Sequence, residues 1–257
     1  MNDGLSGEAT GSLKHDCCVG RKLFMPEVNC LNVERVLMGN MAIEELTPAE
    51  RVSCEEKRPS FEVGRLASRM VQGYYGHAAA IHVAKHPRAK EFAPETSDDG
   101  SFPIGYVYRK DGSAHTYMFD HYLDHLSKDT EVVDDLNRTW LVGSLLNVGD
   151  ALAKFKYFDH APELELLYHL RNGVAHGNRF TFTKSGLDRL KTYPAHNRLA
   201  RARTRELEIV PGVLQEKPVL FEFLEPTDVV ELLQSIEMYL TWICPRGRSL
   251  AHPKLRS

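Results

Sequence analysis

The sequence predicts a mainly α-helical protein with a small β-hairpin before its last helix. Three observations lead to this prediction. Apolar residues recur at helical spacing through several long segments, and Pro and Gly lie between these segments. Two short apolar runs, residues 207–210 and 219–224, flank a Pro-Gly pair and indicate the hairpin.

The chain before the first of these segments shows no regular pattern. Residues 1–42 mix Gly, Ser, Asn, Cys and charged residues without a period of 2 or 3.6. We therefore expect a weakly ordered N-terminal extension over residues 1–42 and one helical domain over residues 43–257. The core of that domain is expected at residues 60–244.

Helix-start signals appear shortly after the extension. Thr47 suits an N-cap, Pro48 suits the first helical position, and Glu50 suits the third. From Ser60 to about Lys85 the apolar residues follow helical spacing, and Pro87 follows this segment. One long amphipathic helix is predicted there.

The middle of the chain alternates between loop and helix signals. Residues 88–118 are rich in Pro and Gly, which favours a loop with one short strand pair around Tyr106–Tyr108. A short helix is predicted near residues 119–126. A longer one near residues 131–158 has an apolar side that would pack on the first helix. The last helix is predicted to begin after Thr227 and to end before Pro245.

The composition limits the classes of function. Among 257 residues, 32 Lys or Arg and 35 Asp or Glu give a formal charge of −3, so a site for a polyanion must be local. The sequence contains no apolar run of about 18 residues, which excludes a predicted membrane span. The five cysteines form no Cys-x-x-Cys pair, and no secretory signal precedes them. These features predict a cytoplasmic protein with reduced thiols.

The most informative segment is a helix predicted to begin at Pro162 and to end at Gly177. Gly177 is expected to adopt the left-handed backbone conformation that ends many helices. At 100° per residue its leucines share one arc, and a polar stripe lies on the opposite side. Arg171 falls about 140° from His176, so one straight helix does not direct both side chains at one phosphate. Gly173 and Gly177 leave room for a backbone or a ligand to approach. The polar stripe comprises Glu165, His169, Asn172 and His176.

The pattern Arg171-Asn172-x-x-x-His176 resembles the motif of the HEPN (higher eukaryotes and prokaryotes nucleotide-binding) domain family. The predicted order of long helix, helix pair, motif helix, strand hairpin and closing helix is also similar to one prokaryotic HEPN subgroup. The resemblance covers residues 60–244. It implies an antiparallel helical bundle that forms a homodimer with its two motifs facing each other. Many members of the family are metal-independent ribonucleases of toxin or antiviral systems.

The residue types of the motif suit this chemistry. Metal-free RNA cleavage needs a group that transfers a proton to or from the ribose hydroxyl or the leaving oxygen, and His176 suits that role. It also needs a cation on the phosphate, and the guanidinium of Arg171 binds two oxygens at once. Asn172 suits a role in orienting either group. In the structural alternative, His176 only stabilises the last helical turn, and Arg171 only pairs with a neighbouring acid.

The segment after the motif is basic. Residues 179–205 contain many Lys and Arg residues and only one acid, Asp188. This excess of positive charge predicts a surface that binds the RNA backbone. A solvated basic loop is the alternative. The candidate RNA-binding residues are Arg179, Lys184, Arg198, Arg201 and His196.

A second group of histidines offers a rival site. His82 and His86 are four residues apart, as are His121 and His125. Two helices that each donate such a pair can hold Zn²⁺. Histidines at this spacing are more often surface residues, so we predict no metal and no cofactor. His77, Asp120 and Asp124 lie near these pairs in the sequence.

Three functions remain as alternatives. The leading hypothesis is a metal-independent endoribonuclease that cleaves RNA by attack of the 2′-hydroxyl at Arg171, Asn172 and His176, as part of a toxin or defence system. The second is a non-catalytic HEPN module that binds nucleotide or RNA or serves as a dimeric interaction partner. The third is a His-rich metal-dependent hydrolase. The resemblance also implies an antitoxin or a nucleotidyltransferase as a partner.

Overall fold

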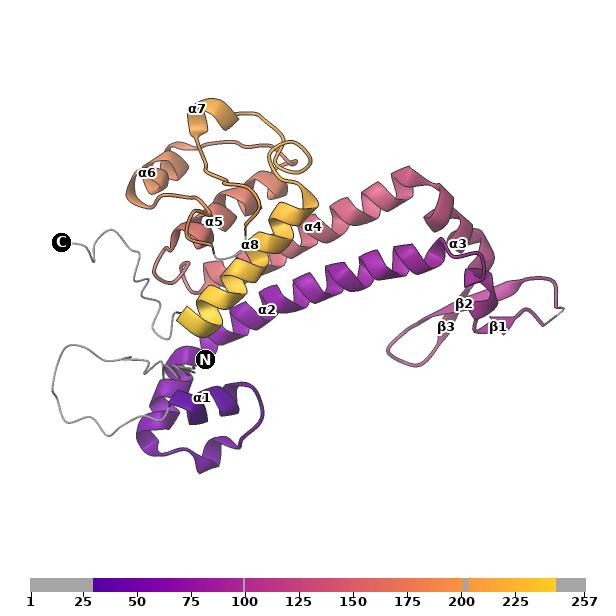
Figure 1. Cartoon of the computed structure of the whole chain (residues 1–257), viewed down its shortest axis with the longest axis horizontal. Helices are drawn as coiled ribbons and strands as arrows, with labels where there is room; N and C mark the ends of the chain where they lie inside the picture. Colours follow the sequence, from indigo (N-terminus) through magenta and orange to yellow (C-terminus); the bar gives the residue numbers. More distant parts are fainter. Residues whose placement is uncertain (1–29, 99, 201–202, 244–257) are drawn as a thin grey trace, which may run out of the picture.

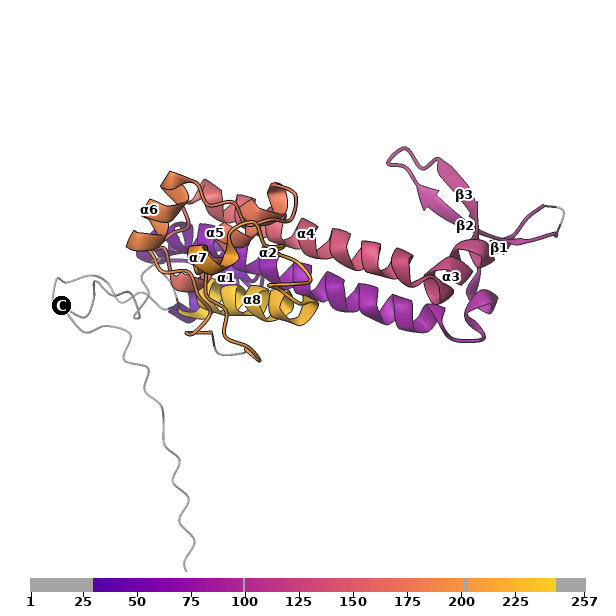
Figure 2. The same ribbon diagram turned by 90° about the horizontal axis from the view of Figure 1, so that it is seen from above.

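The computed structural model describes residues 30–98, 100–200 and 203–243. Two regions differ in shape (Figure 1). A body is built around the helices α5 (Pro162–Ala175) and α8 (Pro226–Met238). An arm leaves this body and consists of the far halves of two long helices, α2 (Pro48–Ala84) and α4 (Thr130–Lys154), together with a small sheet (Figures 1 and 2). The mainly α-helical fold class is confirmed.

The helix α1 (Cys30–Leu37) lies beside the start of α2. Val33 of α1 is fully buried and forms a small separate core with Leu46 and Cys54. The described part of the predicted weakly ordered extension, residues 30–42, thus contains a packed helix. Residues 1–29 of that extension lie outside the described residues.

The helix α2 (Pro48–Ala84) begins as predicted. The hydroxyl of Thr47 accepts a hydrogen bond from the backbone of Glu50, and the Glu50 carboxylate accepts one from the backbone of Thr47. The helix continues through Pro59, so the early start signal and the later amphipathic segment belong to a single helix. Its 37 residues span about 55 Å.

The tip of the arm contains the sheet. After a short 3₁₀ helix (Ala89–Phe92), the strands β1 (Glu95–Thr96), β2 (Pro103–Tyr108) and β3 (Ala114–Met118) pair antiparallel in the order β1-β2-β3. The helices α3 (Phe119–Lys128) and α4 (Thr130–Lys154) then return the chain to the body (Figure 2). The strand pair predicted near Tyr106 is therefore present and gains a third strand.

The predicted β-hairpin before the last helix is wrong. Residues 207–210 and 219–224 do not pair with each other, and a one-turn helix α7 (Pro211–Leu214) lies between them. Most of their apolar side chains are nevertheless buried, because they belong to the same core cluster as the leucines of α5. The buried ones are Leu207, Ile209, Val219, Leu220 and Leu224. Pro218 has no N–H to donate, and Phe221 has a positive φ of 69°, so the second run is a poor strand.

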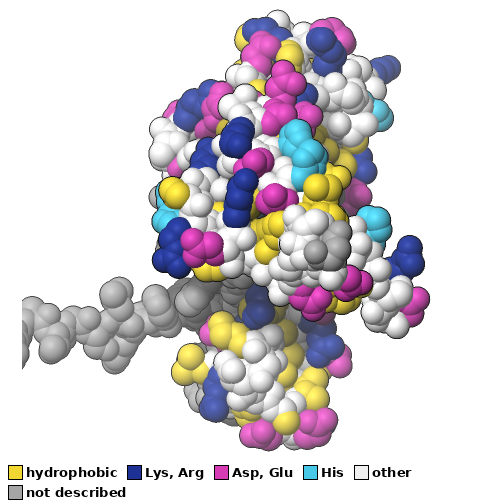
Figure 3. All heavy atoms as spheres, turned by 90° about the vertical axis from the view of Figure 1, so that its right-hand side faces the viewer, with side chains coloured by type: hydrophobic (Ala, Val, Ile, Leu, Met, Phe, Trp, Pro, Cys, Tyr) yellow, Lys and Arg dark blue, Asp and Glu magenta, His cyan; other side chains and the backbone are white. Residues whose placement is uncertain are grey.

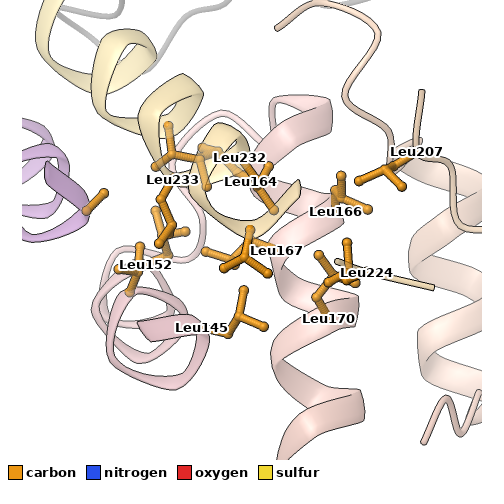
Figure 4. Packing of buried hydrophobic residues seen from close by; sticks show 14 of the residues in the cluster. Leu145, Leu152, Leu164, Leu166, Leu167, Leu170, Leu207, Leu224, Leu232 and Leu233 are labelled. Carbon is orange, nitrogen blue, oxygen red and sulfur yellow. The ribbon is translucent and has the colours of Figure 1, made fainter. Parts of the chain in front are cut away.

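The core of the body surrounds α5 (Figure 4). Leucines of α4, α5 and α8 meet there, and α5 is buried on almost all sides. An additional helix, α6 (Lys184–Thr192), follows α5 in the chain, within the basic segment. The last described residues, Tyr239–Ile243, form one π-helical turn. None of the described helices is long and apolar enough to cross a membrane.

Candidate functional site

The helix α5 has the boundaries that its sequence predicts. Pro162 occupies its first turn, His176 is the C-cap, and Gly177 has a φ of +82°. Gly173 is packed tightly, because a Cβ there would lie 2.4 Å from the side chain of Val219. The expected close approach at Gly173 therefore comes from another segment of the same chain.

Arg171 reaches from α5 across to α4. Its Nε and Nη2 donate to the same carboxylate oxygen of Asp150, at 2.9 and 2.7 Å. Its Nη1 donates to Oδ1 of Asn172 at 3.1 Å. The stem of the side chain passes over Gly149, where a Cβ would lie 2.6 Å from Cγ of Arg171. The structure thus joins two of the predicted catalytic residues and adds Asp150 to them.

His176 lies one turn beyond Asn172 and is exposed. Its backbone N–H donates to the carbonyl oxygen of Asn172 at 3.1 Å, and its own backbone leaves the helical conformation with φ −105° and ψ 42°. A Cβ on the following Gly177 would meet no atom within 4 Å. The imidazole therefore lies at an exposed helix end, one turn after Asn172.

The predicted polar stripe does not form one surface. Glu165 is fully buried, and Nε and Nη2 of Arg189 donate to its two carboxylate oxygens at 2.5 and 2.7 Å. Nδ1 of His160 lies 2.6 Å from the same carboxylate. The guanidinium of Arg189 also lies over the ring of Tyr168, 4.1 Å from its centroid. Arg189 of α6 therefore covers this side of α5, which the sequence alone places in solvent.

His169 of the same stripe is also buried. It is 5% exposed, and its Nε2 has no hydrogen-bond partner in the described part of the chain. Burial, and secondly the nearby Arg189 cation, lower the pKa of His169 to about 4. The ring packs against Tyr168 and Phe182. His169 is a neutral core residue and does not contribute to an exposed site.

The basic segment is largely compensated by acids from elsewhere in the chain. Arg189 pairs with Glu165, and Arg198 pairs with Glu208 at 2.5 Å. Arg203 pairs with Glu206, and Arg205 pairs with Asp228. The sequence shows only Asp188 within this segment, because the other acids lie outside it.

The remaining predicted RNA-binding residues have separate environments. Arg179 donates through Nη1 to the carbonyl oxygen of Glu216 at 2.8 Å. Lys184 is exposed at the start of α6. His196 is half-buried, and burial and the neighbouring Arg198 lower its pKa. Arg201 lies outside the described residues.

The rival histidine pairs do not converge. His121 and His125 of α3 have ring centroids 4.7 Å apart, whereas His82 lies on the exposed face of α2. His77 stacks on Trp140. The described residues include no group of three or more His, Cys, Asp or Glu that could hold a metal ion. The geometry therefore gives no support to the metal-dependent alternative.

Asp150 is the site residue that the sequence did not reveal. It lies 21 positions before Arg171, on the exposed side of a predicted amphipathic helix, where charged residues are common. Only the packing of α4 against α5 brings the two together. Gly149 beside it was the available signal, because a glycine within a helix costs stability and often marks a close approach.

No family model matches this chain, and neither the curated proteins nor the solved structures contain a match to it. The resemblance to the HEPN family thus depends on the motif and on the order of the helices, because residues 207–210 and 219–224 do not form the strand hairpin of that order.

Proposed function

We propose that this protein is a metal-independent endoribonuclease of HEPN type whose site is Arg171, Asn172 and His176. The observation that supports the proposal is the set of hydrogen bonds around the Arg171 guanidinium. Of its five N–H groups, one on Nε and one on Nη2 bind Asp150, and one on Nη1 binds Asn172. Within the described residues, one N–H on each terminal nitrogen of Arg171 is left for a phosphate. The bonds to Asp150 and Asn172 fix the orientation of the guanidinium.

The proposed reaction is transfer of the phosphodiester to the neighbouring 2′ oxygen. The 2′ oxygen forms a bond to phosphorus, the bond from phosphorus to the 5′ oxygen breaks, and a 2′,3′-cyclic phosphate results. One imidazole takes the 2′ proton, and a second gives a proton to the leaving 5′ oxygen. Each chain has one histidine in the motif, so we propose that two copies of the chain complete the site. Arg171 stabilises the negative charge on the phosphate oxygens.

Cleavage of RNA in excess EDTA tests this proposal. A panel of single-stranded RNA, structured RNA and tRNA is incubated with the wild type and with His176→Ala and Arg171→Ala. Each variant is expected to lose about 100-fold or more of the cleavage rate, because each removes a group used in the transition state. Products that end in a cyclic phosphate are expected.

The matched control is His82→Ala, which removes an exposed histidine from the arm. It is expected to cleave as the wild type does. Equal cleavage by the wild type, His176→Ala and Arg171→Ala would contradict the proposal. Loss of cleavage in His82→Ala, together with a bound metal, would favour the histidine pairs instead.

A non-catalytic module is the second candidate, and the ion pair between Arg171 and Asp150 favours it. Asp150 partly neutralises the cation that a phosphate would need. Asp150→Asn separates the two candidates. If Asp150 only stabilises the fold, the variant changes neither cleavage nor RNA binding. If Asp150 positions Arg171 for catalysis, the maximal cleavage rate falls while RNA affinity stays equal or rises. RNA binding without any cleavage, weakened by Arg171→Ala, identifies the non-catalytic module.

A further inference from the structure

The strand β3 is an edge strand at the tip of the arm. Within the described residues it pairs with β2 alone, so its other side has backbone groups that face away from the sheet. Natural proteins commonly protect such an edge with charged residues, Pro or a bulge. The five residues of β3, Ala114 to Met118, include no charged residue, no Pro and no Gly. Four of the five are exposed.

The register shows which backbone groups face outward. Arg109 N–H donates to the carbonyl oxygen of Ser113 at 2.8 Å, so this is a hydrogen-bonded pair. Hydrogen-bonded and non-hydrogen-bonded pairs alternate along an antiparallel ladder. The pairs of His115 with Val107 and of Tyr117 with Gly105 are therefore also hydrogen-bonded. It follows that Ala114 and Thr116 direct their N–H and C=O groups away from β2, as Met118 does its N–H. The C=O of Met118 belongs to the first turn of α3, because Met118 is the N-cap of that helix.

We infer that β3 pairs antiparallel with β3 of a second copy of this chain, with Thr116 opposite Thr116 at a two-fold axis. This register brings together the outward residues, because Ala114 then lies opposite Met118 on both sides of the axis. The Thr116 pair contributes two backbone hydrogen bonds, and the Met118 N–H of each copy donates one to the Ala114 carbonyl oxygen of the other, so the contact contains four backbone hydrogen bonds. The result is one continuous six-stranded sheet.

The side chains suit a second copy better than a nucleic acid. A Thr–Thr pair is favourable across antiparallel strands, and the small Ala114 leaves room for the longer Met118. No like charges are opposed within the strand.

The charge of the tip disfavours RNA as the occupant. Residues 88–128 contain five Lys or Arg and seven Asp or Glu. Figure 3, which faces the end of the arm, shows the two signs interspersed rather than gathered into a basic patch. A polyanion would find no concentrated positive field there. This contact is separate from the one proposed around His176, which lies in the body.

Cysteine cross-linking in the full chain tests the register. Cys17, Cys18, Cys30 and Cys244 are replaced by Ser, and single cysteines are introduced on β3. Two residues opposite each other in a hydrogen-bonded pair have Cα atoms about 5.5 Å apart, within the range of about 4.4–6.8 Å for a disulfide. Thr116→Cys is therefore expected to form covalent dimers on mild oxidation. Ala114→Cys is the matched control, because its two copies lie about 14 Å apart along the strands.

The double variant Ala114→Cys with Met118→Cys is expected to form the dimer again, through the two cross-strand pairs. Equal cross-linking by Thr116→Cys and Ala114→Cys, or none by either Thr116→Cys or the double variant, would overturn the inference. If the edge bound a different protein instead of a second copy, neither Thr116→Cys nor the double variant would form covalent dimers.

A second measurement does not depend on disulfide geometry. Proline at position 116 removes an outward N–H and is tolerated on an edge strand, so the β2–β3 pair stays intact. Light scattering is expected to show a lower mass for Thr116→Pro than for the wild type and for Thr116→Val, because the arm contact is lost and any contact in the body is kept. Far-UV circular dichroism checks that both variants are folded. Equal masses for Thr116→Pro and Thr116→Val would contradict the contact, whereas RNA cleavage by either variant reports separately on the site in the body.

Discussion

The body and the arm use the same kind of helix in opposite ways. In the body, α5 is buried almost completely, and even its Glu165 and His169 lie in the core. In the arm, α2 has no buried residue between Val71 and Ile81, and α4 has none before Leu141. The difference shows that helical periodicity reports where apolar residues recur, and that the number of neighbouring elements decides how much of a helix is covered.

The two regions also differ in what their polar groups do. Buried charged groups in the body are paired within the chain, as Arg189 is with Glu165, although Nε2 of His169 has no partner among the described residues. The arm keeps exposed apolar and aromatic side chains, including Val107, Tyr108 and Tyr122. A body whose buried charges are paired favours one conformation. An arm with an uncovered strand and exposed rings is suited to contact another molecule.

The largest effect that distinguishes the regions is expected at the buried ion pair of the body. Arg189→Met removes the guanidinium from the buried Glu165 carboxylate, which keeps only its contact with His160, and is expected to lower the free energy of unfolding by about 3–5 kcal/mol. Urea denaturation measures this loss. Lys191→Met, on the same helix but in an exposed pair with Asp188, is the control and is expected to change the free energy by less than about 1 kcal/mol.

A double variant distinguishes two causes of that loss of stability, the unpaired charge and the lost packing. Glu165→Gln combined with Arg189→Met removes the unpaired charge and is expected to recover part of the stability. If the single and double variants are equally unstable, the loss comes from the packing of Arg189 on Tyr168 rather than from the charge.

An intermediate effect is expected from pH, through His169. Its pKa is about 4 in the folded state against 6.5 for an ordinary histidine. The unfolded chain therefore binds more protons between these values, and the free energy of unfolding falls as the pH is lowered through this window. The full loss is about 3 kcal/mol. Urea denaturation from pH 7 to pH 4 is expected to show a shallower decline in His169→Leu than in the wild type. The exposed His82→Leu should leave the slope unchanged.

The smallest effect is expected in the arm, from two glycines of α2. A Cβ at position 73 would lie 2.3 Å from the ring of Trp140, whereas a Cβ at position 76 would meet no atom within 4 Å. Gly73→Ala is expected to destabilise the protein by about 1–3 kcal/mol. Gly76→Ala is expected to stabilise it by about 0.5–1 kcal/mol, because alanine is the better helix former. Thermal unfolding followed by tryptophan fluorescence measures both changes. Equal effects would mean that the two helices of the arm do not pack at Trp140.

Parts of the fold that depend on neighbouring residues in the chain were predictable. The Thr47 cap, the Pro162 start and the left-handed Gly177 each follow from local chemistry, and each is present. The hairpin prediction failed because the alternation of residues 207–210 and 219–224 indicates burial but does not name the partner. The strands formed instead at the tip of the arm, where Gly112 has a positive φ in the turn between β2 and β3.

The candidate site divides in the same way. The motif residues Arg171, Asn172 and His176 could be named from their spacing, because they belong to one helix. Asp150 could not, since its role depends on how α4 lies against α5. The prediction that the polar stripe forms one surface was wrong, because α6 places Arg189 against Glu165 and buries that side of α5.

The sequence by itself determined the caps, the helical period and the residues available at the end of α5, because these depend on bonds and contacts within a few positions. The tertiary structure decided which charges are paired, which histidine is neutral in the core and which strand keeps an open edge. Those outcomes depend on segments far apart in the chain, such as Asp150 with Arg171 and Glu165 with Arg189, and no local pattern specifies such a meeting.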